Sequence, residues 1–233
     1  MMKLSIIVLL VSCAIAQTLP GPQTTRGNLR SIQTGDYLRR DYIEKFNATH
    51  SSLKAETSGT AQLIHVSREG DGVHFGAIFN FHEGGYTFLV RADDSFVELE
   101  GSSSSKPVLQ VLTSHSFSLK FDKFPAETYL LVGDVHRYVA MRMIVGKYED
   151  REGRSYAFLD DGWAIFPDRK FKYEIGTDHV LTHYDYFWDK GSDKFYAIKK
   201  VAGKLEVFKT YGEMDESVEA KPTLTLNIVS GAR

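Results

Sequence analysis

The chain has 233 residues, of which 42% are hydrophobic and 25% are charged, and its formal net charge is −2 at pH 7. A chain of this length and apolar content can bury a substantial core. Its near-neutral charge excludes the strongly basic surface typical of nucleic-acid or heparin binding, so we expect no nucleic-acid partner.

Residues 1–16 predict a secretory signal peptide. Lys3 gives the segment a positive start, an apolar run follows to Cys13, and residues 14–16 read Ala-Ile-Ala, a small-x-small cleavage site before Gln17. No later apolar run reaches the roughly 18 residues of a membrane span. We therefore expect a product that is secreted or held in the lumen of the secretory pathway, with no membrane contact after cleavage.

Cysteine usage limits the chemistry of the mature protein. Cys13, the only cysteine, lies inside the predicted signal. Thiolate zinc, iron–sulfur and c-type haem sites are therefore excluded. A secreted chain without disulfides must be stabilised by its core, by partners or by bound metal. Asn47 begins the sequon Asn-Ala-Thr and is the predicted glycosylation site.

Residues 17–58 are predicted to form a leader before the main domain. Its first part is rich in Pro and Gly, whereas residues 36–46 place apolar side chains on one face at helical spacing, with Asp36 as a possible N-cap. This pattern predicts a short helix. Residues 49–57 are polar and are typical of a linker.

Residues 59–233 are predicted to form one all-β domain. Short runs of β-branched and aromatic residues alternate with Gly, Asp and Ser at fairly regular spacing. The pattern favours an antiparallel sandwich or barrel of many short strands. The expected strands include residues 60–67, 72–82, 85–92, 96–100, 108–113, 138–148, 155–159, 163–166 and 180–187.

One pattern occurs twice in this domain. Residues 86–100 read YTFLVRADDSFVELE and residues 156–166 read YAFLDDGWAIF, so that Tyr-x-Phe-Leu precedes two aspartates, a small residue and an aromatic one. We expect each acid pair at the end of a strand, where a loop can aim oxygens at one point. The acid pairs are Asp93-Asp94 and Asp160-Asp161.

Four carboxylates from two such loops would suit a hard divalent cation. Oxygen ligands favour Mn²⁺, Mg²⁺ or Ca²⁺, and adjacent carboxylates repel one another unless a cation or a proton lies between them. Glu98 follows the first pair and is a further possible ligand. The alternative is structural, because Asp-Asp followed by Ser or Gly is also an ordinary hairpin-turn signal.

Other polar residues leave alternatives open. His179 and His183 lie near several aspartates, including Asp185, and a mixed His and carboxylate site would favour Mn²⁺, Fe²⁺ or Zn²⁺. Asp168 is either a ligand or a turn residue. No G-x-S-x-G, P-loop or G-x-G-x-x-G motif is present, so a serine hydrolase or nucleotide-binding protein is not indicated. A glycosidase carboxylate pair stays open.

The acid pairs carry two family resemblances. Residues 84–101, GGYTFLVRADDSFVELEG, resemble the core of PA14-type modules, in which paired aspartates bind calcium and some members bind glycans. This resemblance covers under a tenth of the chain. The Asp-Gly that such modules carry after the next strand is here Glu100-Gly101.

The overall plan resembles a tardigrade family of secreted, anhydrobiosis-related Mn-dependent peroxidases. The shared features are a signal peptide, a similar length, a cysteine-free β-rich body and aspartates in two separated clusters. The resemblance implies an all-β fold, a haem-independent Mn²⁺ site, a small peroxide as substrate, and a role in oxidative or desiccation stress. It carries over only to Asp93, Asp94, Asp160 and Asp161, with Glu98 as a weaker match.

Three functions follow from these patterns. The leading prediction is a secreted Mn-dependent peroxidase whose metal is Mn²⁺, with Ca²⁺ or Zn²⁺ as other possibilities. The second is a Ca²⁺-dependent glycan-binding module. The third is a structural protein in which bound metal only replaces the missing disulfides.

Overall fold

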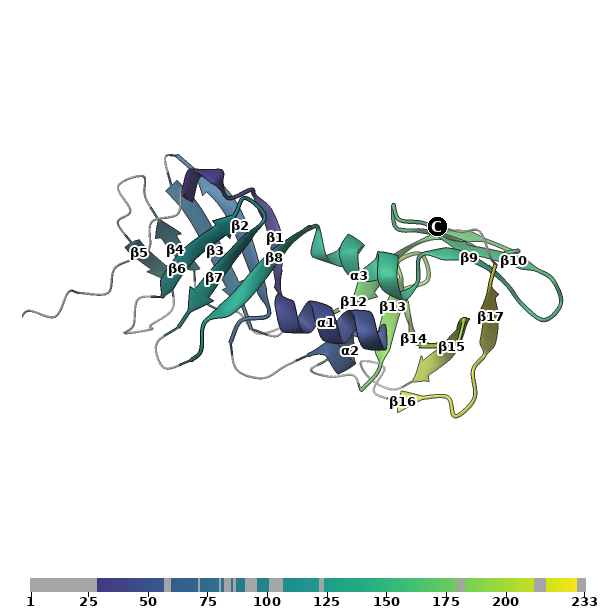
Figure 1. Cartoon of the computed structure of the whole chain (residues 1–233). Coiled ribbons are helices and arrows are strands. Elements are labelled where there is room, and N and C mark those ends of the chain that lie inside the picture. Colours follow the sequence, from purple (N-terminus) through teal and green to yellow (C-terminus); the bar gives the residue numbers. More distant parts are fainter. Residues whose placement is uncertain are drawn as a thin grey trace, which may run out of the picture.

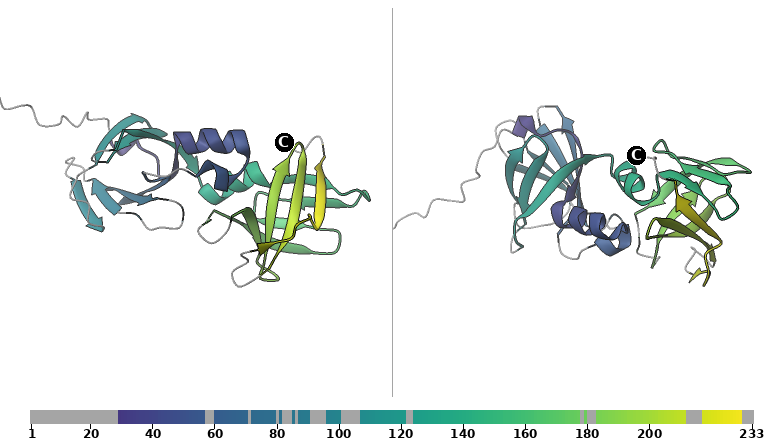
Figure 2. Two further views of the ribbon diagram at one scale, coloured as in Figure 1. Left: turned by 90° about the horizontal axis from the view of Figure 1, so that it is seen from below. Right: turned by 45° about the vertical axis from the view of Figure 1, so that its right-hand side comes forward.

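The computed structural model describes residues 29–56, 60–70, 72–79, 81, 85, 87–90, 96–100, 107–121, 124–177, 179, 183–211 and 217–229, with only the backbone described at 96–100. The predicted signal peptide lies outside this range. The predicted all-β antiparallel fold is confirmed. Two antiparallel sheets lie side by side with helices between them (Figures 1 and 2).

The first sheet is a curled meander. Each strand pairs with the next along the chain from β1 to β5 and from β6 to β8, and β8 returns to pair with β1. Among the described residues β5 and β6 do not pair, so the curl stays open there. Its strands are β1 (Gly35–Arg39), β2 (Leu63–Glu69), β3 (Gly72–Ile78), β4 (Thr87–Val90), β5 (Phe96–Glu100), β6 (Val108–Thr113), β7 (Ser116–Lys120) and β8 (Glu127–Gly133).

The second sheet closes on itself as a barrel. Its strands again pair in chain order, and β17 pairs with both β15 and β9, which completes the ring. The short β16 (Ser217–Val218) pairs with the end of β15. The barrel strands are β9 (Gly146–Glu149), β10 (Ser155–Phe158), β11 (Trp163–Ile165), β12 (Lys170–Gly176), β13 (Asp185–Asp189), β14 (Lys194–Val201), β15 (Lys204–Tyr211) and β17 (Leu224–Ile228).

The N-terminal helix begins later than the sequence predicts. A single turn η1 (Leu29–Ser31) comes first, residues 35–39 form β1, and the helix α1 spans Arg40–Thr49. Tyr37 and Leu38 are both fully buried, but they belong to two different core clusters. Successive strand residues point to opposite faces. Tyr37 and Leu38, which fit one face of the predicted helix, therefore lie on opposite faces of β1.

A second difference concerns residues 138–148, which we expected as a strand. The segment instead contains most of the helix α3 (Val135–Met143) and then β9. Asp134 caps α3, because its side chain accepts a hydrogen bond from the Arg137 N–H at 2.8 Å. The buried residues of α3 recur at helical spacing, which the β-branched and aromatic composition of the segment obscures. They are Val135, Val139, Ala140 and Met143.

The molecule has two hydrophobic cores. The first lies within the curled sheet, around Phe75 and Phe117. The second fills the barrel around Phe158 and Phe187 and continues without a break into the helices α1, α2 (Ser52–Ala55) and α3. Although α1 and α2 connect β1 to β2 of the first sheet, they therefore share their core with the barrel. Within the described residues, no helix is both long and apolar enough to cross a bilayer.

Candidate functional site

The second predicted acid pair lies in the hairpin turn between β10 and β11. The Asp160 carboxylate accepts a hydrogen bond from Arg137 Nη2 at 2.5 Å, and both side chains are about half exposed. Asp161 accepts from the Trp163 N–H at 3.2 Å, an Asx-type turn contact. The turn is closed by a backbone hydrogen bond from Leu159 to Trp163. Both carboxylates thus have partners within the chain.

The first acid pair, Asp93-Asp94, lies outside the described residues, and of Glu98 only the backbone is described. The strands that precede the two pairs, β4 and β10, belong to different sheets at opposite ends of the molecule (Figure 1). Within the described part of the chain, no three His, Asp or Glu side chains are arranged to hold a metal ion. A metal site shared by both pairs stays a prediction.

Two further predicted residues are on the surface. Asn47 is exposed on α1, and its side-chain oxygen accepts a hydrogen bond from Arg142 Nε at 3.3 Å. Asp168 is exposed in the bend between β11 and β12. An exposed position is compatible with a glycosylated asparagine, and the position of Asp168 agrees with its alternative as a turn residue.

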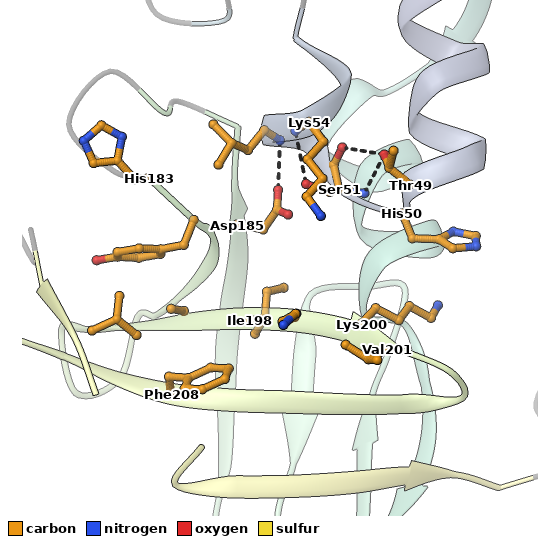
Figure 3. A pocket seen from close by; sticks show the side chains of 15 residues that line it. Thr49, His50, Ser51, Lys54, His183, Asp185, Ile198, Lys200, Val201 and Phe208 are labelled. Atoms are coloured by element: carbon orange, nitrogen blue, oxygen red, sulfur yellow. Dashed lines mark hydrogen bonds between the residues drawn. The ribbon is translucent and has the colours of Figure 1, made fainter. Parts of the chain in front are cut away.

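A cleft of about 600 Å³ lies between the helix pair α1–α2 and the strands β13 to β15 (Figure 3). The connection between the two helices forms one side. There His50 adopts a left-handed conformation with φ of 50° and donates its N–H to the Phe46 carbonyl, which ends α1. The Ser51 side chain then accepts from the Lys54 N–H at 3.1 Å and begins α2. These two caps fix the edge of the cleft.

The barrel strands β14 and β15 form the other side. Ile198 and Val207 pair across β14 and β15 and belong to the barrel core. The neighbouring pair, Ala197 and Phe208, lies on the opposite face of these strands, and residues from both faces, Ile198 included, line the cleft. Val201, which is 41% exposed, extends this apolar surface. Apolar residues of β14 and β15 thus border the cavity.

A buried histidine joins the helix pair to the barrel beside this cleft. Nδ1 of His179 lies 2.6 Å from Glu56 Oε1, and its Nε2 lies 3.6 Å from Asp185 Oδ1, which is ion-pair distance but too long for a hydrogen bond. The same Asp185 oxygen accepts the Leu53 N–H at 3.0 Å. The His179 side chain is only 1% exposed. Two carboxylates, one from each side of the junction, therefore enclose one imidazole.

The protonation state of His179 follows from this enclosure. Burial alone would lower its pKa, but the interactions with Asp185 and Glu56 outweigh burial and raise the pKa to about 9. The ring is therefore protonated at neutral pH. Its positive charge offsets the charge of Asp185, the acidic residue that lines the cleft.

The remaining charged groups around the cleft are basic. Lys54, Lys199 and Lys200 line it together with His50 and His183. Lys200 Nζ donates to the Arg142 carbonyl at 3.0 Å, and burial lowers its pKa. In the described part of the chain, neither Lys54 nor Lys199 has an acidic partner within ion-pair distance. The cleft thus combines an apolar wall with a positive charge.

Sequence reasoning reached part of this site. It singled out His179, His183 and Asp185 as a possible mixed metal site, and the structure places all three at or beside the cleft. It did not find Glu56, because this residue lies in a polar segment 123 positions before His179. No local pattern marks a contact of that range.

Comparisons with known proteins do not assign the chain to a family. No family model, no curated protein and no solved structure matches the chain.

Proposed function

We propose that the protein binds a small, largely apolar organic molecule in the cleft between α1–α2 and the barrel wall. The observation that carries the proposal is a cavity of about 600 Å³ with the apolar residues Ile198, Val201 and Phe208 in its lining. Ligand sites are typically cavities of roughly 300–1,000 Å³ with mostly apolar linings and a few convergent polar groups. Both properties are met here.

The barrel interior is less suited to this role. Small antiparallel barrels either fill their interior with side chains or hold one ligand inside. Here Phe158 lies at the centre of an aromatic cluster, with ring centroids at 5.3 Å from Tyr173, 5.4 Å from Phe187 and 5.7 Å from Phe166. Side chains therefore occupy the interior, which supports a ligand position in the cleft.

The expected affinity is moderate. A drug-sized ligand gains about 0.3 kcal/mol per non-hydrogen atom. A molecule of about 20 such atoms would then bind with about 6 kcal/mol, which corresponds to a dissociation constant of about 40 μM. Fluorescence titration covers this range directly.

The test uses the neutral probe N-phenyl-1-naphthylamine, whose fluorescence rises in apolar surroundings. We expect saturable binding by the intact protein and at least a tenfold loss in Val201→Trp, because the larger side chain fills the cleft. The matched control is Ile228→Trp, at a position 39% exposed on β17 that does not line the cleft. Circular dichroism verifies that both variants fold.

Two outcomes would contradict the proposal. One is the absence of saturable probe binding by the intact protein. The other is equal loss in the folded Val201→Trp and Ile228→Trp variants, which would locate the probe elsewhere. The Mn-dependent peroxidase expected from the sequence stays a prediction. The Asp160 carboxylate, one of the predicted ligands, forms an ion pair with Arg137 through Oδ2.

A further inference from the structure

We propose that the ligand of this cleft is an amphipathic anion, with an acidic head group next to Lys54 and Lys199 and an apolar tail along β14 and β15. This inference rests on the proposed function and names the class of ligand. Its evidence is the distribution of charge around the cleft together with the apolar residues of β14 and β15.

Two lysines border the cleft. Lys54 and Lys199 are both exposed and both line the cleft. They come from opposite sides of it, α2 and β14. Neither forms an ion pair among the described residues, although Glu206 lies across from Lys199 on β15. A neutral ligand would leave these ammonium groups in water, whereas an acidic group between them gains two charge-assisted contacts.

The acidic residue of the cleft does not cancel this charge. Asp185 has a side chain that is only 11% exposed, accepts the Leu53 N–H, and lies 3.6 Å from the ring nitrogen of His179. Its charge is thus directed to groups inside the junction. The charged groups that remain available to a ligand are the lysines.

The lysines and the apolar residue Phe208 lie in different parts of the cleft, which suits a ligand with a charged head group and an apolar tail. In Figure 3, Lys54 extends from α2 toward β14 and Lys200 borders the cleft at the end of the same strand, whereas Phe208 lies farther from the helices on β15. An anion with an apolar chain can therefore place its charge near the helices and its chain over Phe208. A cation with the same chain would meet like charges, so the site should discriminate between them.

The test compares four ligands that share one alkyl chain: dodecanoate, dodecyl phosphate, dodecanol and dodecyltrimethylammonium. Each displaces N-phenyl-1-naphthylamine from the full-length protein at low ionic strength. We expect the two anions to bind at least tenfold more tightly than dodecanol, and the ammonium compound most weakly. The ranking of dodecanoate against dodecyl phosphate distinguishes a carboxylate from a phosphate head group. Added salt should reduce the preference, because the lysines are exposed.

The double variant Lys54→Met/Lys199→Met separates the head group from the tail. Methionine keeps the apolar stem and removes the charge, so dodecanol should bind as before while the advantage of the anions is lost. The control Lys194→Met changes an exposed lysine of β14 that does not line the cleft, and it should preserve the preference.

The outcomes separate this inference from the proposed function. Equal binding of dodecanol and dodecanoate by the intact protein would overturn the anionic head group and leave the apolar site standing. An anion preference that survives the double variant would also overturn it. If neither N-phenyl-1-naphthylamine nor any of the four ligands binds, the proposed function itself is wrong.

Discussion

The two β units of the chain are built on one plan and differ in how they are completed. Both are antiparallel meanders whose last strand returns to the first, β8 to β1 and β17 to β9. The first has a core of its own, whereas the core of the second extends into the helices. The second unit therefore depends on residues that the sequence places inside the first.

This difference explains where the cleft lies. The segment between β1 and β2 contains α1 and α2, which share the hydrophobic core of the barrel, while α1 also contacts β1 and β8 of the first sheet. The cavity lies between this helix pair and the strands β13 to β15. The contact of Glu56 and Asp185 with His179 holds the junction beside it.

The largest expected effect separates the two cores. Phe187 is 1% exposed in the barrel and Phe117 is fully buried in the first sheet, each with several aromatic neighbours. We expect Phe187→Ala and Phe117→Ala each to lower the free energy of unfolding by about 3–5 kcal/mol. Because the strands that line the cleft pack on the core that contains Phe187, only Phe187→Ala should also weaken probe binding under native conditions.

The measurement is urea unfolding followed by tryptophan fluorescence, which reports on the barrel because Trp163 and Trp188 both lie there. Circular dichroism reports on both units. A loss below 1 kcal/mol in either variant would contradict the assigned core. Equal loss of probe binding in both variants would show that the first sheet supports the cleft as strongly as the barrel does.

The next largest expected effect depends on pH and concerns the contacts of His179 with Glu56 and Asp185. The pKa of His179 is raised from 6.5 to about 9, so its contribution to stability is fully present below pH 6.5 and is lost as pH rises through 9. A difference of this size corresponds to about 3 kcal/mol. We expect the free energy of unfolding to fall over this interval in the intact protein.

The variant His179→Gln should remove most of this pH dependence, because glutamine does not titrate. His183→Gln, at an exposed position on the same cleft, is the control and should preserve it. Thermal unfolding at a series of pH values provides the measurement. The same slope in His179→Gln and the intact protein would assign the dependence to another group.

The smallest expected effect concerns the acid pairs, one from each unit. If they bind Mn²⁺ together, as the sequence predicts, Asp94→Ala and Asp161→Ala should each weaken binding by more than tenfold, or about 1.4 kcal/mol. Their effects should not add, because both would damage one site. Calorimetric titration of Mn²⁺, Ca²⁺ and Zn²⁺ into both variants and the double variant measures this. Unchanged binding in either single variant would show that the aspartates of that pair act only as turn residues.

The sequence predicted the type of fold because its signal is local. Turn residues at regular spacing and β-branched runs indicate strands wherever they occur, and this was sufficient for the all-β fold. The errors arose where one segment contains two kinds of element. Residues 36–46 combine the end of β1 with the start of α1, and residues 138–148 combine α3 with β9.

The candidate site was harder to predict because its parts are far apart in the chain. Ala197 and Phe208 are ordinary strand residues, and nothing in their neighbourhood shows that they face a cavity. The repeated acid motif was visible in the sequence but follows the fourth strand of one unit and the second strand of the other. Similarity of short motifs therefore did not identify equivalent positions in the two meanders.

The position of the helix pair also sets an order of events during synthesis. Leu53 and Glu56 leave the ribosome long before their partners, since Asp185 follows Leu53 by 132 residues. Contacts of such long range form slowly, because a large loop must close first. When the first sheet of a nascent chain is complete, Leu53 and Glu56 of the helix region therefore still lack their partners from the barrel. The protein acquires its cleft only after residues 183–218, which complete the lining, have been synthesised.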